Sequence, residues 1–400
     1  MKPLLKPEPV FVTYGWCRTA YTMVRSLGRL GVDVHVGDPS PLAMSRYSRY
    51  TQTFTRMPEF FEEPDLYMEV LAEALDRTKA KVLFPCHEDV ELVIKGKDSL
   101  PSDVHVAVPD IDMWRIAEDK LEYVEHVERA GCPVPRTFNV HSSEELEVVL
   151  NKLAAPYVIK TRIGNSAKGV RIAKNPEEAR QAFFHLVDEF DLLPERWPTI
   201  QEFVAGQKVG VLGLFSHGRH VSSIVFDIKR SKGAGNFGTS TFRVVIDDPV
   251  TKANAIRAME SLNWHGVVDM DWLRDSDGIA RLIDINGRLG GATALTYISG
   301  MDMPYLWYLV ALGESEIPEK DIRVGSKARW ILGDTLGLLD ALRKGRFGEC
   351  IDVLTPERHC RHDDFDLRDP APFLFQSMDY FRKFLASGGS LNPVKGNMVR

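Results

Sequence analysis

The segment from 266 to 291 constrains this chain more than any other, because its pattern is that of a hairpin with acidic side chains face to face. Two runs rich in Val, Ile and Leu flank Asp277-Gly278, and Asp-Gly is among the strongest short signals for a hairpin turn. With that pair at the turn centre, Asp271 lies directly opposite Asp284. Side chains alternate with period two, so both acids point to the same face of the strands.

Like charges directly opposed across two strands destabilise a sheet unless a cation lies between them. The same register places Asp269 opposite Asn286, and Arg288 follows two residues later on the same face. Carboxylate and amide oxygens are preferred ligands of Mg²⁺, and a metal flanked by a guanidinium can hold a phosphate. A hairpin with a solvated acidic face is the structural alternative, and the hairpin alone does not decide between the two.

Composition limits the class of protein. A chain of 400 residues with 44% hydrophobic content can form two or three domains with sizeable cores. Its net charge of -6 gives no basic face for nucleic acid, and no run of about eighteen apolar residues could span a bilayer. The first ten residues lack the apolar run of a signal peptide, and the five cysteines have no C-x-x-C spacing. We expect a protein of the reducing cytoplasm without nucleic-acid or membrane partners.

The first 115 residues alternate between strand and helix patterns, which predicts an open parallel sheet with crossover helices. A dinucleotide fold is the competing interpretation, but GWCRTA at 15–20 stands where a G-x-G-x-x-G motif would be expected. His87 and Glu88 come just after a strand-like run. They either face a cleft or satisfy free N–H groups at the start of a helix.

The hairpin resembles the magnesium-binding end of the ATP-grasp superfamily, in which an acidic residue on one strand precedes an E-x-N-x-R run on the next. The strand 157–160 ends in a lysine before a loop containing Gly164, Ser166 and Gly169, and this resembles the family's lysine and its phosphate-covering loop. Residues 201–206 resemble the hinge that binds adenine, and Asp119-Lys120 resembles the earlier lysine. Four such segments in the family's order identify the chain as a member of the ATP-grasp superfamily. Residues 45–54 and 85–93 resemble segments of its carbamoyl-phosphate-synthase-like, carboxylate-amine ligase branch.

The resemblance implies a fold of mixed α/β and α+β class. It implies an N-terminal open parallel sheet, the domain that precedes ATP-grasp domains, at 1–115. A two-lobed ATP-grasp domain would follow at 116–320, with the first lobe at 116–204 and the second at 205–320. Residues 321–400 would form a C-terminal extension packed on that core. Aromatic residues of this extension are expected to pack as core, namely Trp330, Phe373, Phe375, Tyr380, Phe381 and Phe384.

The resemblance also implies a site for ATP and Mg²⁺, with Mn²⁺ as an alternative metal. The implied metal ligands are Asp271, Asp284 and Asn286, and Arg288 would stabilise charge at the reacting acyl carbon. The implied nucleotide-binding residues are Lys120, Val158, Lys160, Ser166, Gly169, Glu202, Phe203, Val204, Lys208, Leu273 and Ile283. Two positions depart from the family's pattern. Asp284 is one methylene shorter than the usual Glu, and Gln207-Lys208 stands where related ligases often have an acid for the ribose, so ribose recognition stays open.

A basic, glycine-rich segment from 229 to 243 comes just before the hairpin. Its glycines predict a mobile loop, because no packed strand would favour them. Lys229 and Arg230 on such a loop suit a phosphate or carboxylate that must be enclosed and released, and we predict both as catalytic residues. A solvated surface loop is the structural alternative.

The function that these features predict is ATP-dependent ligation of a small-molecule carboxylate to an amine. The product would be an amide or peptide bond, formed through an acyl phosphate with release of ADP and phosphate. A homodimer is the expected assembly. The alternatives are an ATP phosphotransferase, a carboxylase-like component acting on bicarbonate, and a nucleotide-binding protein without turnover. No A-M-K-M segment for biotin attachment occurs in the sequence, so a carboxylase would need that domain from another chain.

Overall fold

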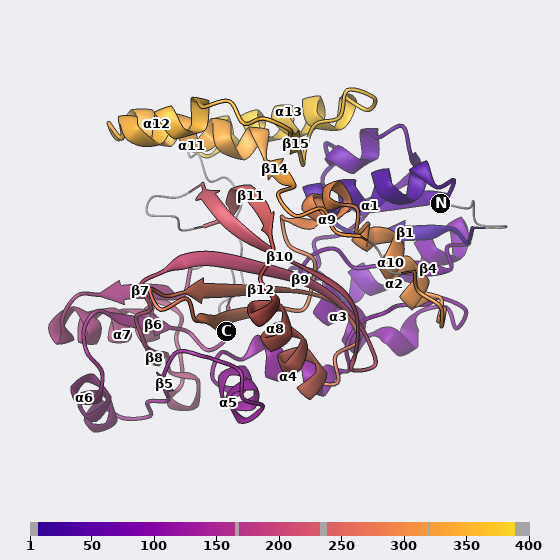
Figure 1. Ribbon diagram of the computed structural model, residues 1–400. Helices are drawn as coiled ribbons and strands as arrows, with labels where there is room; N and C mark the ends of the chain where they lie inside the picture. The colour runs from indigo at the N-terminus through magenta and orange to yellow at the C-terminus, as the bar shows by residue number, and fades with distance from the viewer. Residues whose placement is uncertain (1–6, 165–167, 233–237, 319–320, 389–400) are drawn as a thin grey trace.

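The computed structural model describes residues 7–164, 168–232, 238–318 and 321–388, and these fold into three sheets that follow one another along the chain (Figure 1). The fold is of mixed α/β and α+β class, as predicted. Within the described ranges, no helix has the length and apolar character needed to cross a membrane.

The first sheet is parallel, as the N-terminal alternation predicts, with the order β3-β2-β1-β4. Its strands are β1 (Val10–Val12), β2 (Val34–Asp38), β3 (Thr51–Arg56) and β4 (Val82–Phe84), connected through α1 (Arg18–Arg29), the short helix η1 (Met44–Tyr47) and α2 (Pro64–Thr78). β1 and β4 are parallel neighbours, so their carboxyl ends lie side by side. Tyr14 and His87 stack there, with ring centroids 4.0 Å apart.

The second sheet is small, antiparallel and has a core of its own. Its order is β5-β8-β6-β7, with β5 (Thr137–Phe138), β6 (Tyr157–Lys160), β7 (Val170–Ala173) and β8 (Thr199–Glu202). Helices α6 (Ser143–Lys152) and α7 (Pro176–Glu189) pack on it, and buried residues such as Ile159, Phe183 and Ile200 form the core between them. Both helices begin at a capped residue, because Ser142 accepts from the Glu145 amide and Asn175 accepts from the Glu178 amide.

The third sheet has seven strands in the order β13-β12-β9-β10-β11-β14-β15. All neighbours are antiparallel except β14 and β15. The strands are β9 (Gln207–Ser216), β10 (Arg219–Ser231), β11 (Ser240–Ile246), β12 (Gly266–Arg274), β13 (Ala280–Asn286), β14 (Lys327–Arg329) and β15 (Cys360–His362). His217 and Gly218 form the turn that connects β9 to β10.

Helices cover both faces of the seven-stranded sheet. Val209 and Val211 of β9 pack with α4 (Ile111–Glu118), α5 (Glu122–Arg129) and α8 (Pro249–Ser261), whereas Leu212 and Leu214 pack with α9 (Thr293–Ser299) and α10 (Met303–Ala311). Both cores continue into the parallel sheet, so these two sheets form one hydrophobic body, while the small sheet is separate. The predicted boundaries at residues 115, 204 and 320 stay predictions.

The described part of the C-terminal extension consists of α11 (Ile331–Arg343), α12 (Phe347–Leu354), α13 (Ala371–Ala386) and the edge strands β14 and β15 (Figure 1). The remaining short helices among the described residues are α3 (Val90–Lys95), η2 (Lys97–Ser99) and η3 (Pro194–Arg196). Trp330 and Tyr380 are buried, in line with the predicted aromatic core. The prediction is wrong for Phe381, because its side chain is 63% exposed on the outer face of α13.

The register of the acidic hairpin is confirmed, although the predicted turn is wrong. Asp271 pairs with Asp284, and Asp269 pairs with Asn286. The turn, however, spans 275–279 rather than two residues, with the Asp275 side chain accepting from two backbone amides in it. A bulge next to Asp271 shifts the register by one residue between the turn and the acids. The longer turn and the bulge offset each other, which restores the predicted pairing.

The basic segment before this hairpin is mostly strand, which corrects the prediction of a mobile loop from residue 229 onward. β10 continues through Ser231, and β11 begins at Ser240, so Lys229, Arg230 and Arg243 all lie in strands. Cross-strand hydrogen bonding decides the conformation there. The glycines at 233 and 235 lie outside the described residues.

Candidate active site

The acidic side chains of β12 and β13 are brought together on one face of the seven-stranded sheet. Asp269 and Asp271 alternate on β12 with the fully buried Met270 and Trp272, which point to the opposite face. Burial raises the pKa of Asp271 above its usual range, and the negative charge of Asp284 raises it further. Burial also raises the pKa of Asp269, with Asp271 adding to the effect. These half-buried carboxylates are therefore held close together without a full set of counter-charges.

Two lysines reach this acidic face from outside the sheet. Lys160 ends β6 of the small sheet, and its ammonium donates to the Ile283 carbonyl on β13 at 3.2 Å. Lys120 follows α4, donates to the Gly164 carbonyl at 2.8 Å and lies 3.5 Å from an oxygen of Asp284. Burial lowers the pKa of Lys160 to about 8, although Asp284 acts in the opposite direction. A buried ammonium of this kind is stabilised by an anionic ligand such as a phosphate.

Arg288 connects the hairpin to the residues that follow β4 of the parallel sheet. Its Nε and one Nη donate to the same oxygen of Glu88, at 2.9 and 2.6 Å. Glu88 follows β4, and its carboxylate is buried beside this guanidinium. Burial raises the pKa of Glu118, at the end of α4, to about 8, and Glu88 contributes to that shift. Sequence reasoning missed Glu118, for which the sequence holds no signal beyond its place two residues before Lys120.

The oxygen donors of this face suit a hard divalent cation that is also bound by a ligand. Among the described residues, no three His, Cys, Asp or Glu side chains are grouped so that they alone could hold a metal. Mg²⁺ commonly uses one or two carboxylates and takes its other ligands from phosphates and water. Asp271 and Asp284 would supply the carboxylates. Asn286 donates through its amide nitrogen to the Asp269 carbonyl at 3.3 Å, which leaves its amide oxygen available as an acceptor.

The predicted nucleotide residues lie on both sides of the junction between the small sheet and the hairpin. Val158 is buried two residues before Lys160 on β6, and Leu273 pairs with Lys208 across β12 and β9. Glu202, at the end of β8, accepts from the Arg136 guanidinium at 2.7 Å. The hinge residue Phe203 is 37% exposed, Val204 follows it half-buried, and Ile283 extends along β13 beside Asp284.

The loop after β6 is only partly described. A side chain at Gly169 would place its Cβ 2.0 Å from the Thr161 hydroxyl, so this position accepts glycine alone without rearrangement. Ser166, predicted to contact phosphate, lies outside the described residues.

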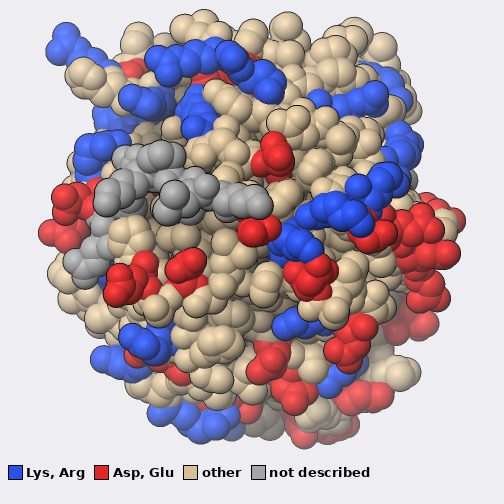
Figure 2. Space-filling model, turned by 90° about the vertical axis from the view of Figure 1, so that its right-hand side faces the viewer, with Lys and Arg blue, Asp and Glu red and all other residues tan. Residues whose placement is uncertain are grey.

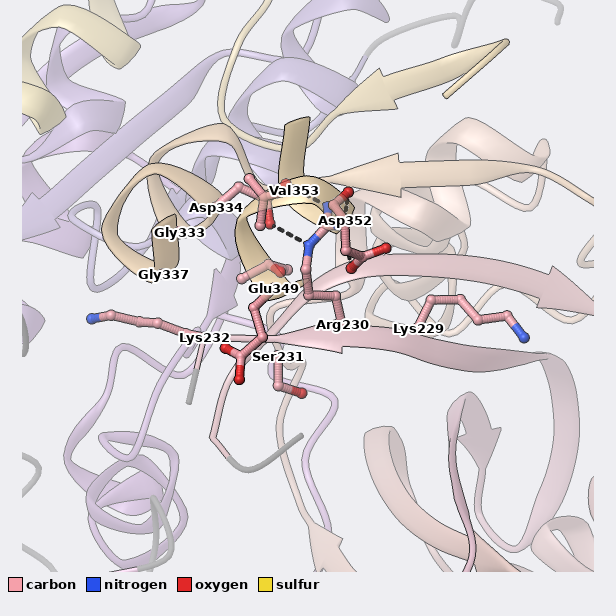
Figure 3. A pocket seen from close by; sticks show the side chains of 11 residues that line it. Lys229, Arg230, Ser231, Lys232, Gly333, Asp334, Gly337, Glu349, Asp352 and Val353 are labelled. Carbon is pink, nitrogen blue, oxygen red and sulfur yellow. Dashed lines mark hydrogen bonds and ion pairs between the residues drawn. The ribbon is translucent and has the colours of Figure 1, made fainter. Parts of the chain in front are cut away.

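Arg230 and Lys229 each form an ion pair with an acidic residue of this chain, whereas residues of a substrate-binding loop would bind the substrate instead (Figure 3). Arg230 forms a two-point ion pair with Asp334 of α11, at 2.9 and 2.8 Å, and a further one with Asp352 of α12 at 3.0 Å. Lys229 points away from them and pairs with Asp227 at 2.7 Å. Arg230 lines a cavity of about 290 Å³ between β10 and these helices. The catalytic role predicted for both residues stays a prediction.

We expect Arg230→Ala to destabilise the contact between β10 and the C-terminal helices. The buried Asp334 would retain Arg329, 2.7 Å away, so we expect a loss of about 1–3 kcal/mol in the free energy of unfolding, below the full cost of an isolated buried charge. Urea unfolding followed by tryptophan fluorescence measures this. Steady-state kinetics of the same variant test the catalytic prediction. Unchanged stability with a raised KM for the carboxylate would assign Arg230 to the substrate instead.

A second buried cluster, not predicted from the sequence, holds the loop that follows Arg288. The Gly291 carbonyl accepts from Arg18 at 3.0 Å and from Arg243 at 2.5 Å. Arg243 also pairs with Asp363, which follows β15, and neither residue has exposed surface. At Gly290 an added Cβ would lie 1.6 Å from an oxygen of Asp269. The loop therefore packs against the acidic hairpin, and Arg18 of α1, Arg243 of β11 and Asp363 hold it there.

Comparison with known proteins agrees with this geometry. Residues 117–292 match the model of an ATP-grasp domain family. The chain is 23% identical over 323 residues to the formate-dependent phosphoribosylglycinamide formyltransferase of Ignicoccus hospitalis, covering 78% of this chain and 77% of that protein.

Two solved structures have the same fold. One is N5-carboxyaminoimidazole synthetase from Staphylococcus aureus complexed with ADP, with a TM-score of 0.64 and 16% identity over 86% of this chain and 88% of that one. The other is the biotin carboxylase domain dimer of the Hydrogenobacter thermophilus 2-oxoglutarate carboxylase with MgADP, ADP and bicarbonate. Its TM-score is 0.63, with 14% identity over 80% of this chain and 74% of that one. Residues 117–292 are therefore identified as an ATP-grasp domain.

Proposed function

We propose that this protein joins a small carboxylic acid to an amine, with ATP as the energy source and an acyl phosphate as the intermediate. The observation that carries the proposal is the meeting of Lys120 and Lys160 with the acidic pair Asp271 and Asp284, from elements far apart in the chain. Cations and carboxylates held together in one buried place suit a magnesium triphosphate, because its phosphates need the cations and its metal needs the carboxylates.

The chemistry begins with a carboxylate, which is inert to amines because its leaving group would be oxide. A carboxylate oxygen attacks the γ-phosphorus of ATP, the bond to the β–γ bridging oxygen breaks, and ADP leaves. The amine nitrogen then attacks the acyl carbon, phosphate leaves with the bonding pair, and the nitrogen loses a proton. Both steps depend on orientation and charge stabilisation more than on covalent help from the protein.

Each group of this chain has a defined task in that scheme. Lys120 and Lys160 would hold the phosphate oxygens, while Asp271, Asp284 and Asn286 would hold Mg²⁺, or Mn²⁺ in its place. When bound, the metal would neutralise charge on the β- and γ-phosphates. Arg288 stabilises charge at the acyl carbon, and Glu88 fixes its guanidinium in position. Val158, Leu273 and Ile283 line the adenine, and the hinge at 202–204 contacts its edge.

The substrates are small molecules. The named relatives act with formate or are solved with bicarbonate, so one-carbon acids are the first carboxylates to test, followed by amino acids. On the face drawn in Figure 2, Lys and Arg side chains gather in the upper part and Asp and Glu side chains at the right, and the net charge of -6 gives the protein no overall basic character for a phosphate backbone. All five cysteines are unpaired, which fits the cytoplasm as the place of action.

Product analysis tests the proposal. Purified protein with MgATP is offered pairs of carboxylate and amine, and ADP and phosphate are measured separately. A ligase releases both in equal amounts, and only when both partners are present. ADP without phosphate would indicate a phosphotransferase. Activity that requires added biotin would indicate a carboxylase component, and nucleotide binding with no turnover for any pair would contradict the proposal.

Nucleotide affinity tests the two lysines independently of the unknown substrates. We expect Lys160→Met and Lys120→Met each to bind MgATP about 10- to 100-fold more weakly, because a hydrogen bond to a charged group contributes about 1.5–3 kcal/mol. Adenosine should bind as before. Calorimetric titration with both ligands measures the difference, and Lys174→Met, at an exposed lysine of the same lobe, is the matched control. Equal losses for ATP and adenosine would mean that the lysines only support the fold.

A further inference from the structure

The three C-terminal helices carry an unusual share of the exposed apolar surface. Of nineteen exposed large hydrophobic side chains among the described residues, nine lie on α11, α12 and α13, so this surface is concentrated in one layer of the molecule (Figure 1). Single exposed hydrophobic residues are ordinary, but a contiguous group usually marks an interaction site.

Helix α13 presents its exposed residues as a regular stripe. Leu374, Met378, Phe381 and Leu385 are 56–63% exposed, and their spacing of four, three and four places them on one side of the helix. This is the spacing of side chains that pack one helix against another. The opposite side of α13 is firmly attached to the N-terminal region, where Tyr380 stacks on Trp16 with ring centroids 5.3 Å apart. The stripe is therefore the outer face of a well-anchored helix.

Helix α12 presents a second stripe of the same kind. Phe347, Ile351 and Leu354 are 66–68% exposed at a spacing of four and three. On its inner side Cys350 is buried and Asp352 holds Arg230. The connecting helix α11 joins the two stripes into one layer, because the guanidinium of its Arg343 lies over the Phe384 ring of α13, 5.6 Å from the centroid.

We propose that α12 and α13 form a homodimer interface, in which α12 of one copy packs on α13 of its partner. The exposed parts of the nine side chains amount to on the order of 1,000 Å² of apolar surface, which meets the roughly 800 Å² per partner of a stable interface. Exposed charges beside the stripes are complementary. Glu349 flanks the α12 stripe and Arg382 flanks the α13 stripe, with 49% and 60% of their side chains exposed, and each is also paired within its own chain, with Arg346 and Asp379. A two-fold axis makes both α12–α13 contacts at once, acid to base.

The proposal is independent of the ligase chemistry, and the mass of the full-length protein in solution tests it. Sedimentation velocity over a range of concentrations should show a dimer for the unchanged protein. Phe381→Glu and Ile351→Glu should each raise the dimer dissociation constant by at least about tenfold, because a charge replaces an apolar anchor at the centre of the interface. Leu193→Glu, at a leucine 63% exposed in the small lobe, is the matched control and should remain dimeric. Circular dichroism of each variant verifies folding.

Charge reversal tests the pairing of α12 with α13 specifically. Glu349→Arg and Arg382→Glu should each weaken the dimer, and the double variant should restore it, because the attraction then returns with opposite sign. A monomeric unchanged protein would overturn the proposal. So would a dimer insensitive to the glutamate variants, or single reversals that the double variant does not repair. The proposal would equally be overturned if the full-length protein is monomeric and a variant that ends at Gly388 dimerises. That result would mean that residues 389–400 cover the stripes in the full-length protein.

Discussion

Asp284→Asn is expected to lower turnover by about 10²- to 10³-fold, the cost of removing one preorganised group that stabilises charge in the reacting state. Asp284 pairs with Asp271 across the hairpin and lies 3.5 Å from the Lys120 ammonium. Asparagine keeps the shape and a metal-binding oxygen but loses the charge that balances the cations of a bound magnesium nucleotide. The measurement is kcat for ADP and phosphate release with saturating MgATP.

The same variant should be at least as stable as the unchanged protein, which separates a functional charge from a structural one. Asp284 is one of the charges that raise the pKa of Asp271, so its neutralisation relieves repulsion across the strands, an effect of about 0.2–1 kcal/mol. Asp284→Glu, which restores the acid expected at this position, should retain activity. Asp277→Asn, in the exposed turn of the same hairpin, is the matched control. Unchanged kcat in folded Asp284→Asn would refute the role of the acidic pair.

The second large effect is expected from Asp363→Ala, this time on stability. Asp363 has no exposed surface, and it is the ion-pair partner of the equally buried Arg243, with Arg18 3.6 Å away. Its removal leaves a buried guanidinium without a counter-charge, for which about 3–5 kcal/mol is the usual cost. Urea unfolding monitored by tryptophan fluorescence measures the loss.

Two comparisons give that experiment its specificity. Glu357→Gln removes a half-exposed ion pair with Lys327 in the same extension, and we expect a change of at most about 1 kcal/mol. Asp363→Asn keeps a hydrogen-bond acceptor for Arg243, so its loss of stability should lie between those of Asp363→Ala and Glu357→Gln. Arg243 also donates to the Gly291 carbonyl, in the loop that packs against the acidic hairpin. We therefore expect the folded fraction of Asp363→Asn to have a lower kcat and an unchanged affinity for MgADP. Asp363→Ala with unchanged stability would show that the two arginines need no buried counter-charge.

The sequence by itself determined the features that depend on neighbouring residues. The alternation of acidic and apolar residues in the hairpin, and the lysine that ends β6, follow from the period of a strand and can be read locally. The pairing of Asp271 with Asp284 was also predictable, even though the turn was not, because a bulge offset the longer turn. Turns and bulges depend on single backbone conformations, for which Asp-Gly is only a statistical signal.

Only the tertiary structure decided which distant charges meet. Glu88 and Arg288 are 200 residues apart, Arg243 and Asp363 are 120 apart, and Arg230 and Asp334 are 104 apart. No local sequence pattern encodes such pairs. They form when whole helices and strands pack through their apolar faces, and the hydrophobic effect that drives this packing is non-directional. The sequence predicted Arg230 on a mobile basic loop, whereas it lies in a strand and holds the C-terminal helices. Those helices in turn place Phe381 on the surface.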